Sequence, residues 1–416
     1  MGIVYEPAAS GRKIGNDANA GKFEALRSQA AGAAPSLADE GFARALDLEF
    51  GLPGRSGADR IVVLGIGGSA LGSRAVHEAS RTPQTLPIEV VDNIDPQALE
   101  AAWQGGDPLR TAWVVISKSG GTTETLAQFG VVRTRLAELG GGEIHVVTGP
   151  DGALRDLANA RGYPTHDVPV EVGGRFSVFT PAATVPLALA GHDVARLIEG
   201  ARAARRDPAI AAEIAAFLIA AYGSGCNVVT LWSYDERLET VGEWFRQLWA
   251  ESLGKRRADG TAVGQTPVHC VGSTDQHSIQ QLMVEGPADK AVLVLCGPAD
   301  DSIVAPAGEA GAGAGHSLGA ILTAMRRATS AEMVRAGCPL ATLRLDAWDE
   351  SSMGNLLMQF LLATVLGGRL LEVDPYGQPG VEAAKIATKE LLSEPGGARS
   401  AEIAQLLGEG EGVRAP

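Results

Sequence analysis

One carboxylate, Glu251, stands near the end of an amphipathic run with the sequence WFRQLWAESLGKR. Two loops rich in glycine and hydroxyl groups precede it, at 65–72 (GIGGSALG) and 117–125 (SKSGGTTET). A histidine in a polar turn, His277, and a lysine, Lys385, follow it. Glycine-rich loops at helix starts bind anions, and one carboxylate is enough to move a proton between adjacent carbons. Together these groups suit the isomerisation of a small phosphorylated sugar.

The second loop is the more informative of the two because it is rich in hydroxyl groups. Ser117, Ser119, Thr122 and Thr123 place four hydroxyls within seven residues at the start of a helical pattern, and Lys118 adds a full positive charge. A phosphate monoester requires backbone N–H groups, hydroxyl donors and the partial positive charge of a helix N-terminus. An ordinary helix cap needs only one hydroxyl. The loop therefore predicts a phosphate site.

The first loop, which contains Gly68 and Ser69, is compatible with other functions. It fits the dinucleotide pattern G-x-G-x-x-A after a strand, and Asp92 ends the next strand. A nicotinamide-dependent dehydrogenase is therefore an alternative, and so is a tight turn without a ligand. The hydroxyl-rich second loop has no use in a dinucleotide fold, and it favours the sugar phosphate.

The residues around Glu251 predict a partly buried carboxyl group. Gln247 lies four residues earlier, so the two side chains share one face of a helix. The neighbouring side chains are apolar: Trp244, Phe245, Leu248, Trp249 and Leu253. Composition alone favours a solvated acid at a helix end, and this apolar setting is what argues for a base.

The bulk composition excludes several classes of protein. The chain of 416 residues carries a formal charge of −14, which argues against a nucleic-acid or anionic-membrane partner. No apolar run approaches the 18 residues expected of a membrane span, and the seven histidines show no metal-binding spacing. The four cysteines lie far apart in apolar stretches. We expect buried free thiols, a cytoplasmic protein, and neither a metal nor another cofactor.

Strands and helices alternate along most of the chain. Short runs rich in branched apolar residues predict seven strands, at 60–66, 87–92, 111–117, 143–149, 226–233, 290–296 and 340–347. Helical patterns lie between them, which indicates βαβ units and parallel sheets. The predicted division is a helical segment at 1–54, a first α/β domain at 55–200 that holds both loops, a second at 201–378, and a C-terminal helix and tail at 379–416.

With these motifs in place, the chain resembles the bacterial phosphoglucose isomerase (glucose-6-phosphate isomerase) family. The matching segments are LGIGGSALG (64–72), SKSGGTTETL (117–126), VGGRFSVFTPAATVPLALAG (172–191), ESLGK (251–255), STDQHSIQQLMVEGP (273–287) and QPGVEAAKIATKEL (378–391). The resemblance implies two flavodoxin-like sugar-isomerase (SIS) domains. It also implies interconversion of glucose 6-phosphate and fructose 6-phosphate in glycolysis and gluconeogenesis, by a homodimer with shared active sites.

The resemblance also implies a role for each site residue. Glu251 is the base that moves a proton between C1 and C2, and Arg175 holds the enediolate. His277, supplied by the neighbouring subunit, opens the sugar ring with Lys385, which by default is a solvated lysine in mid-helix. Substrate-binding residues are Gly68, Ser69, Ser117, Lys118, Ser119, Thr122 and Gln247.

The chain departs from the family pattern at two places. It has GVEAAK where the family commonly has GVELGK, and Gly120-Gly121 where the phosphate loop often carries a bulky residue. A bifunctional glucose/mannose enzyme and a sugar-phosphate sensor without catalysis stay open as alternatives.

Overall fold

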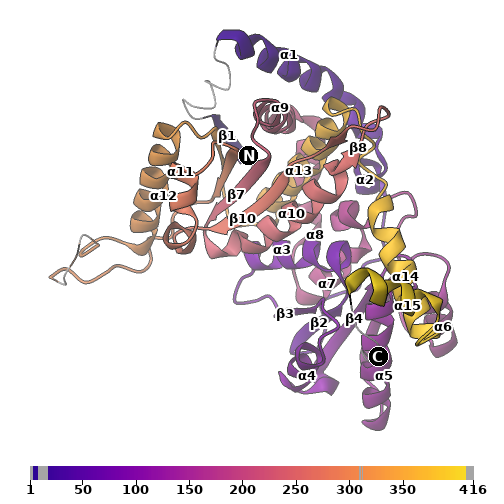
Figure 1. Cartoon of the computed structure of the whole chain (residues 1–416). Coiled ribbons are helices and arrows are strands. Elements are labelled where there is room, and N and C mark those ends of the chain that lie inside the picture. Colours follow the sequence, from indigo (N-terminus) through magenta and orange to yellow (C-terminus); the bar gives the residue numbers. More distant parts are fainter. Residues whose placement is uncertain (1–2, 8–16, 309–310, 312, 409–416) are drawn as a thin grey trace.

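The computed structural model describes residues 3–7, 17–308, 311 and 313–408, which form two five-stranded sheets, a short two-stranded ribbon and the helices around them (Figure 1). One sheet is built from the first half of the chain and lies at the bottom of Figure 1. The other is built mainly from the second half. Helices cover both faces of each sheet, so the predicted α/β fold with parallel sheets is confirmed.

The first sheet is entirely parallel, with the strand order β3-β2-β4-β5-β6. Helix α7 covers one face, and α4, α5 and α6 cover the other. Because side chains alternate along a strand, Val114 packs towards α7 while Trp113 and Val115 pack towards α5. The elements are β2 (Arg60–Leu64), α3 (Leu71–Ser80), β3 (Ile88–Val91), α4 (Pro96–Gln104), β4 (Thr111–Ser117), α5 (Thr123–Glu138), β5 (Glu143–Thr148), α6 (Ala153–Arg161), β6 (Thr165–Asp167) and α7 (Pro181–Ala190).

The second sheet has the order β1-β12-β11-β7-β10, and four of its strands are parallel. Leu293 and Leu295 of β11 face the cluster with α9, α10 and α13, and Val292 and Val294 face α11 and α12. The elements are α8 (Val194–Arg206), α9 (Ala209–Gly223), β7 (Val228–Tyr234), α10 (Glu239–Leu253), β8 (Lys255–Arg256), β9 (Ala262–Val263), β10 (Thr266–Val271), α11 (Gln280–Glu285), β11 (Lys290–Cys296), α12 (Leu318–Arg335), β12 (Leu340–Leu345) and α13 (Glu350–Leu370).

The N-terminal segment departs from the helical prediction. Residues 3–7 form strand β1 (Ile3–Pro7), which pairs antiparallel with β12 and thereby joins the second sheet. Helices α1 (Asp17–Ala33) and α2 (Gly41–Arg44) then follow as expected. The predicted domain boundaries stay a proposal, and we propose one change: strand β1 belongs to the second domain. Sequence reasoning also missed β6, β10 and the β8–β9 ribbon.

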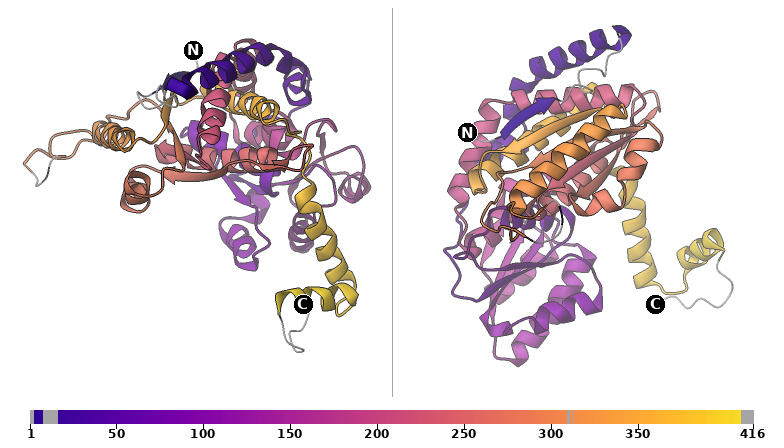
Figure 2. Two further views of the ribbon diagram at one scale, coloured as in Figure 1. Left: turned by 45° about the horizontal axis from the view of Figure 1, so that its top comes forward. Right: turned by 90° about the vertical axis from the view of Figure 1, so that its left-hand side faces the viewer.

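The C-terminal segment is helical, as expected. Helices α14 (Glu382–Ser393) and α15 (Ala398–Leu407) extend away from the two sheets (Figure 2), and neither contains a buried residue.

Two buried features correspond to the predictions from composition. Helix α13 is the one helix in the described part of the chain that is long and apolar enough to cross a membrane by length and composition, but 83% of its most apolar window is buried inside the protein. Its hydropathy is therefore that of a core helix. All four cysteines are free and buried, as predicted.

Helices α8 and α13 pack unusually closely, because each presents a glycine to the other. A Cβ atom added to Gly354 would lie 1.9 Å from the carbonyl oxygen of Leu197, and one added to Gly200 would lie 1.9 Å from that of Ser351. Real side-chain atoms do not approach a backbone oxygen so closely, so the two helix backbones must separate to admit a methyl group.

We expect Gly354→Ala to lower the free energy of unfolding by about 1–3 kcal/mol, the usual range for overpacking a core. Gly130→Ala is the matched control, because it lies in α5 with no atom within 4 Å of its added Cβ. That change should stabilise the protein by about 0.5–1 kcal/mol. Thermal unfolding of both variants checks the prediction, which fails if their melting temperatures shift alike.

Candidate active site

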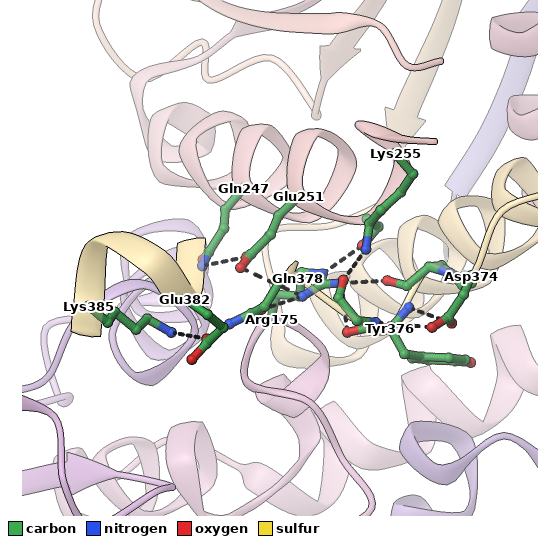
Figure 3. A network of polar contacts seen from close by, with 12 residues as sticks. Arg175, Gln247, Glu251, Lys255, Asp374, Tyr376, Gln378, Glu382 and Lys385 are labelled. Atoms are coloured by element: carbon green, nitrogen blue, oxygen red, sulfur yellow. Dashed lines mark hydrogen bonds and ion pairs between the residues drawn. The ribbon is translucent and has the colours of Figure 1, made fainter. Parts of the chain in front are cut away.

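Helix α10 provides the central carboxylate of the site. Gln247 Nε2 lies 3.3 Å from Glu251 Oε2, and both side chains extend from the helix towards Arg175 (Figure 3). The Glu251 side chain is 22% exposed, so the expected partly buried carboxyl group is found. The opposite face holds the helix in place through buried side chains: Val241, Trp244, Phe245, Leu248, Trp249 and Leu253.

Arg175 lies beside this carboxylate, in the 3-10 turn Gly174–Phe179. Its Nη1 is 3.7 Å from Glu251 Oε1, and its side chain is only 2% exposed. Nε donates to Ser252 Oγ at 2.7 Å, and Nη1 donates to Gln378 Oε1 at 2.8 Å (Figure 3). Nη2 donates to backbone carbonyl oxygens of the segment 375–377.

The pKa of Arg175 is lowered by burial, and the nearby Glu251 carboxylate works in the opposite direction. An arginine side chain nevertheless remains charged at any physiological pH. The arrangement therefore holds a permanent cation against the Glu251 carboxylate.

The first glycine loop packs directly against these residues. A Cβ atom on Gly68 would lie 2.1 Å from the carbonyl oxygen of Gly174, and one on Gly67 would lie 2.8 Å from Gln247 Nε2. The Ser177 hydroxyl donates to the Gly68 carbonyl oxygen at 3.2 Å. Glycine is required here because the backbone of the loop touches both the turn that carries Arg175 and the helix that carries Glu251.

The second loop lies next to the first, because β2 and β4 are neighbouring parallel strands. The Ser117 and Thr122 hydroxyl oxygens are 2.8 Å apart, and the Gly121 amide donates to Ser119 Oγ at 3.3 Å. Thr122 is the N-cap residue of α5, yet its side chain makes no capping hydrogen bond. The start of α5 thus keeps the anion-binding character that the sequence predicted.

Lys118 is anchored to a segment outside its own loop. Its Nζ donates to the Val170 carbonyl oxygen at 2.8 Å, in the segment just before the turn that carries Arg175. Burial lowers the pKa of Lys118, and the Glu171 carboxylate counteracts that effect.

A cavity of about 690 Å³ borders Glu251 on the side of the β8–β9 ribbon. Two of its lining residues were missed by the role assignments made from sequence. Lys255 Nζ donates to the Gly377 carbonyl oxygen, and burial and the Arg175 charge lower its pKa. Gln378 accepts from Arg175. Both residues stand inside the motifs ESLGK and QPGVEAAK, so the motifs themselves were the available signal.

The structure does not bring Lys385 to this carboxylate. It lies on α14 with its side chain 55% exposed, and its Nζ donates to Glu382 Oε1 at 2.9 Å (Figure 3). Its setting is that of the solvated lysine which composition alone favours.

His277 is also distant from Glu251 within one chain. Helix α10 begins beyond the carboxyl end of β7 and runs back to the amino ends of the parallel strands, where Gly264 lies against Leu253. Strand β10 then runs back, parallel to β7, and the turn Thr274–His277 follows it. A helix of 15 residues is about 22 Å long. Glu251 therefore lies at the amino ends of the parallel strands of the second sheet, and His277 lies at their carboxyl ends.

Within the described residues, no group of three His, Cys, Asp or Glu side chains has an arrangement that could hold a metal ion. The arrangement found here offers a carboxylate to move a proton, a buried cation beside it to stabilise negative charge, and an adjoining loop for a phosphate.

Comparison with known proteins identifies the family. A model described as phosphoglucose isomerase matches residues 51–292. The chain is 40% identical over 349 residues to a probable glucose-6-phosphate isomerase of Haloarcula marismortui, covering 80% of this chain and 78% of that protein. It is 38% identical over 369 residues to the glucose-6-phosphate isomerase of Rubrobacter xylanophilus, covering 82% and 84%. The chain belongs to the phosphoglucose isomerase family. It is therefore an aldose–ketose isomerase, as the resemblance predicted.

Solved structures support the fold of this family member. A hypothetical protein of Thermus thermophilus superposes with a TM-score of 0.76 at 29% identity, covering 92% of this chain and 94% of that one. A glucose-6-phosphate isomerase of Chlamydia trachomatis superposes with a TM-score of 0.72 at 21% identity, covering 94% and 78%.

The two glycines that replace a bulky residue of the family differ in their surroundings. Gly120 has a φ of +63°. Its added Cβ would lie 3.3 Å from both Thr148 Oγ1 and the Asp151 carbonyl oxygen. Around Gly121 the nearest atom is 3.9 Å away. The loop therefore has room for a side chain at position 121 and not at position 120.

We expect Gly120→Ala to raise the KM for fructose 6-phosphate by about 5- to 30-fold. The left-handed conformation costs an alanine about 1–2 kcal/mol, and binding would have to restore it. Gly121→Ala should leave KM within about twofold of the wild type, because its φ lies outside the left-handed region and its Cβ has room. Steady-state kinetics of the pair decides, and equal effects would contradict this account of the loop.

Proposed function

We propose that the chain interconverts D-glucose 6-phosphate and D-fructose 6-phosphate by ring opening and proton transfer through a cis-enediolate. The observation that carries the proposal is the pairing of Glu251 with the buried Arg175 at 3.7 Å, on a helix that touches the first glycine loop. The named relatives support the same substrates.

The phosphate is held by the second loop. Ser117, Ser119 and Thr122 supply hydroxyls, and the uncapped start of α5 supplies N–H groups and a partial positive charge. Lys118 contributes its positive charge while its Nζ donates to the Val170 carbonyl oxygen. The sugar then lies over Gly68 and Ser69 of the first loop, beside α10.

The proton moves through Glu251. Its carboxylate takes the proton from C2 of the open-chain aldose and returns it to C1, while the hydroxyl proton passes from O2 to O1. The enediolate carries negative charge during this transfer, and the fixed Arg175 guanidinium stabilises it. Gln247 orients the carboxylate through its 3.3 Å contact and binds the sugar.

Ring opening needs a proton donor and acceptor at the C1 hydroxyl and the ring oxygen, which suits a histidine near neutral pH. We assign it to His277 with Lys385. Glu251 and His277 of one chain lie at opposite ends of the parallel strands of the second sheet. The proposal therefore requires His277 from the partner subunit of a homodimer. The exposed apolar side chains on the protruding α14 and α15 support a partner surface: Ile386, Leu392, Leu406 and Leu407.

The proposed setting is glycolysis and gluconeogenesis in the cytoplasm, since free buried thiols suit a reducing compartment. A sensor without catalysis has no need of Glu251, and none of the relatives reported above is named as a glucose/mannose enzyme.

We expect Glu251→Gln to lower kcat by about 10²–10⁴-fold with little change in KM, because the amide cannot accept the proton. Glu243→Gln is the matched control. It lies on the same helix, paired with Arg74 at 3.2 Å, and should keep most of the activity. A coupled assay on fructose 6-phosphate in the presence of EDTA measures both. If Glu251→Gln retains more than about a tenth of wild-type turnover, the base is another group.

Subunit mixing tests the shared site. We expect Glu251→Gln and His277→Ala subunits each to be nearly inactive alone, and the test mixes them under conditions of subunit exchange. A mixed dimer has one site with both lesions and one with neither. Activity should therefore reappear at about a quarter of the wild-type level, since half the dimers are mixed and half their sites are intact. If mixed dimers are detected by native mass spectrometry and the mixture stays inactive, His277 does not act across the interface.

A further inference from the structure

The four parallel strands of the second sheet repeat the order of the first four strands of the first sheet, and a cavity lies at the equivalent place. Strands β7 and β11 are neighbours in the second sheet, as β2 and β4 are in the first. A cavity of about 500 Å³ lies beyond their carboxyl ends, lined by the connections after β7, β10 and β11 and by α12. Doubly wound sheets bind ligands beyond the carboxyl ends of their strands, at the point where the strand order reverses. The volume of the cavity is that of a small-molecule site. No role in the reaction described above uses it.

Most charges in this cavity are already paired with each other. Arg237 Nε lies 3.2 Å from Asp235 Oδ1, and its Nη2 lies 3.7 Å from Asp300 Oδ2. The same guanidinium stacks over the Trp348 ring at 4.4 Å. Glu236 lies at the cavity with its side chain exposed to solvent, where water screens its charge. Neither Asp235 nor Asp300 is therefore left to attract a cation.

Arg326 is the exception. It projects from α12 and is half-buried, and among the residues described by the structure it makes no hydrogen bond or ion pair. Burial raises the pKa of Tyr234 and of Cys296, and the charge of Arg326 counteracts both effects. The guanidinium thus lies near the ends of β7 and β11. An unpaired and partly desolvated guanidinium favours an anionic partner.

The helix start beside this cavity differs from that of the phosphate loop. In α12 the Ala320 amide donates to Ser317 Oγ at 3.0 Å, and the Gly319 amide donates to the Asp300 carbonyl oxygen at 3.1 Å. The backbone donors that α5 leaves available are therefore occupied here. An anion in this cavity depends on Arg326 and on hydroxyl groups.

We propose that this cavity is a second anion site, which takes a small polyhydroxylated phosphate or carboxylate. Arg326 binds the anionic group, and the hydroxyl-bearing side chains of Ser273, Thr274 and Thr323 line the space for the rest of the ligand. Ser273 and Thr274 begin the turn that ends at His277. An occupant therefore contacts the turn that carries the proposed ring-opening histidine.

The test uses radiolabelled inorganic phosphate in equilibrium dialysis. The full-length variant Ser119→Ala/Thr122→Ala weakens the catalytic phosphate loop, so that the remaining binding reports the second cavity. We expect one phosphate per chain to remain bound. Adding Arg326→Gln should weaken this binding by about 10- to 100-fold, the value of a charge-assisted hydrogen bond, and Arg326→Lys should weaken it less. Arg327→Gln is the matched control, because that exposed neighbour does not line the cavity.

Hydrogen exchange locates the bound phosphate independently of catalysis. In the double variant, phosphate should slow exchange in the segments 234–237, 272–277 and 297–303, and Arg326→Gln should abolish this protection. The proposal is overturned if no phosphate remains bound to the double variant, if Arg327→Gln weakens binding as much as Arg326→Gln, or if the protection appears in other segments. Failure of the proposed catalytic function would show instead as unchanged turnover in Glu251→Gln.

Discussion

The geometry of the active site depends on one buried charge. A guanidinium that is 2% exposed is tolerated only if nearly all its N–H groups have partners, because an unpaired buried charge costs several kcal/mol. Arg175 finds these partners in the end of α10 and in the segment 375–378, which lie far apart in the chain. Satisfying this one side chain therefore fixes Glu251, the first glycine loop and the C-terminal loop relative to one another.

The two sheets contribute different parts of the candidate site, although four parallel strands have the same order in each. The first contributes both loops at its carboxyl edge, where α/β folds usually bind ligands. The second sheet contributes Glu251 at the amino ends of its parallel strands, near the end of α10. The cavity around Arg326 lies at the carboxyl ends of the same strands. The two ends of the second sheet's parallel strands therefore carry different groups within one chain. A site that uses both Glu251 and His277 needs two chains.

Much of this arrangement could be predicted from the sequence, because the central strands are runs of branched apolar residues and the loops carry their chemistry locally. Strand β10 escaped prediction since an edge strand tolerates Pro267 and His269, and the strand at 3–7 gave no apolar run. Long-range partners could not be predicted either. No local pattern shows that Lys118 reaches the Val170 carbonyl oxygen, or that Arg175 reaches Gln378.

Strand β1 has a consequence for the order in which the protein is made. Its register pairs Ile3 with Leu345, while all strands of the first sheet are complete by Asp167. During synthesis, the first sheet can assemble as soon as it leaves the ribosome, because domains fold as units from the N-terminus onwards. Strand β1 must wait, unpaired, until β12 exists. It is made before every other described strand and joins its sheet after all of them, so the second sheet can be completed only once translation has passed residue 345.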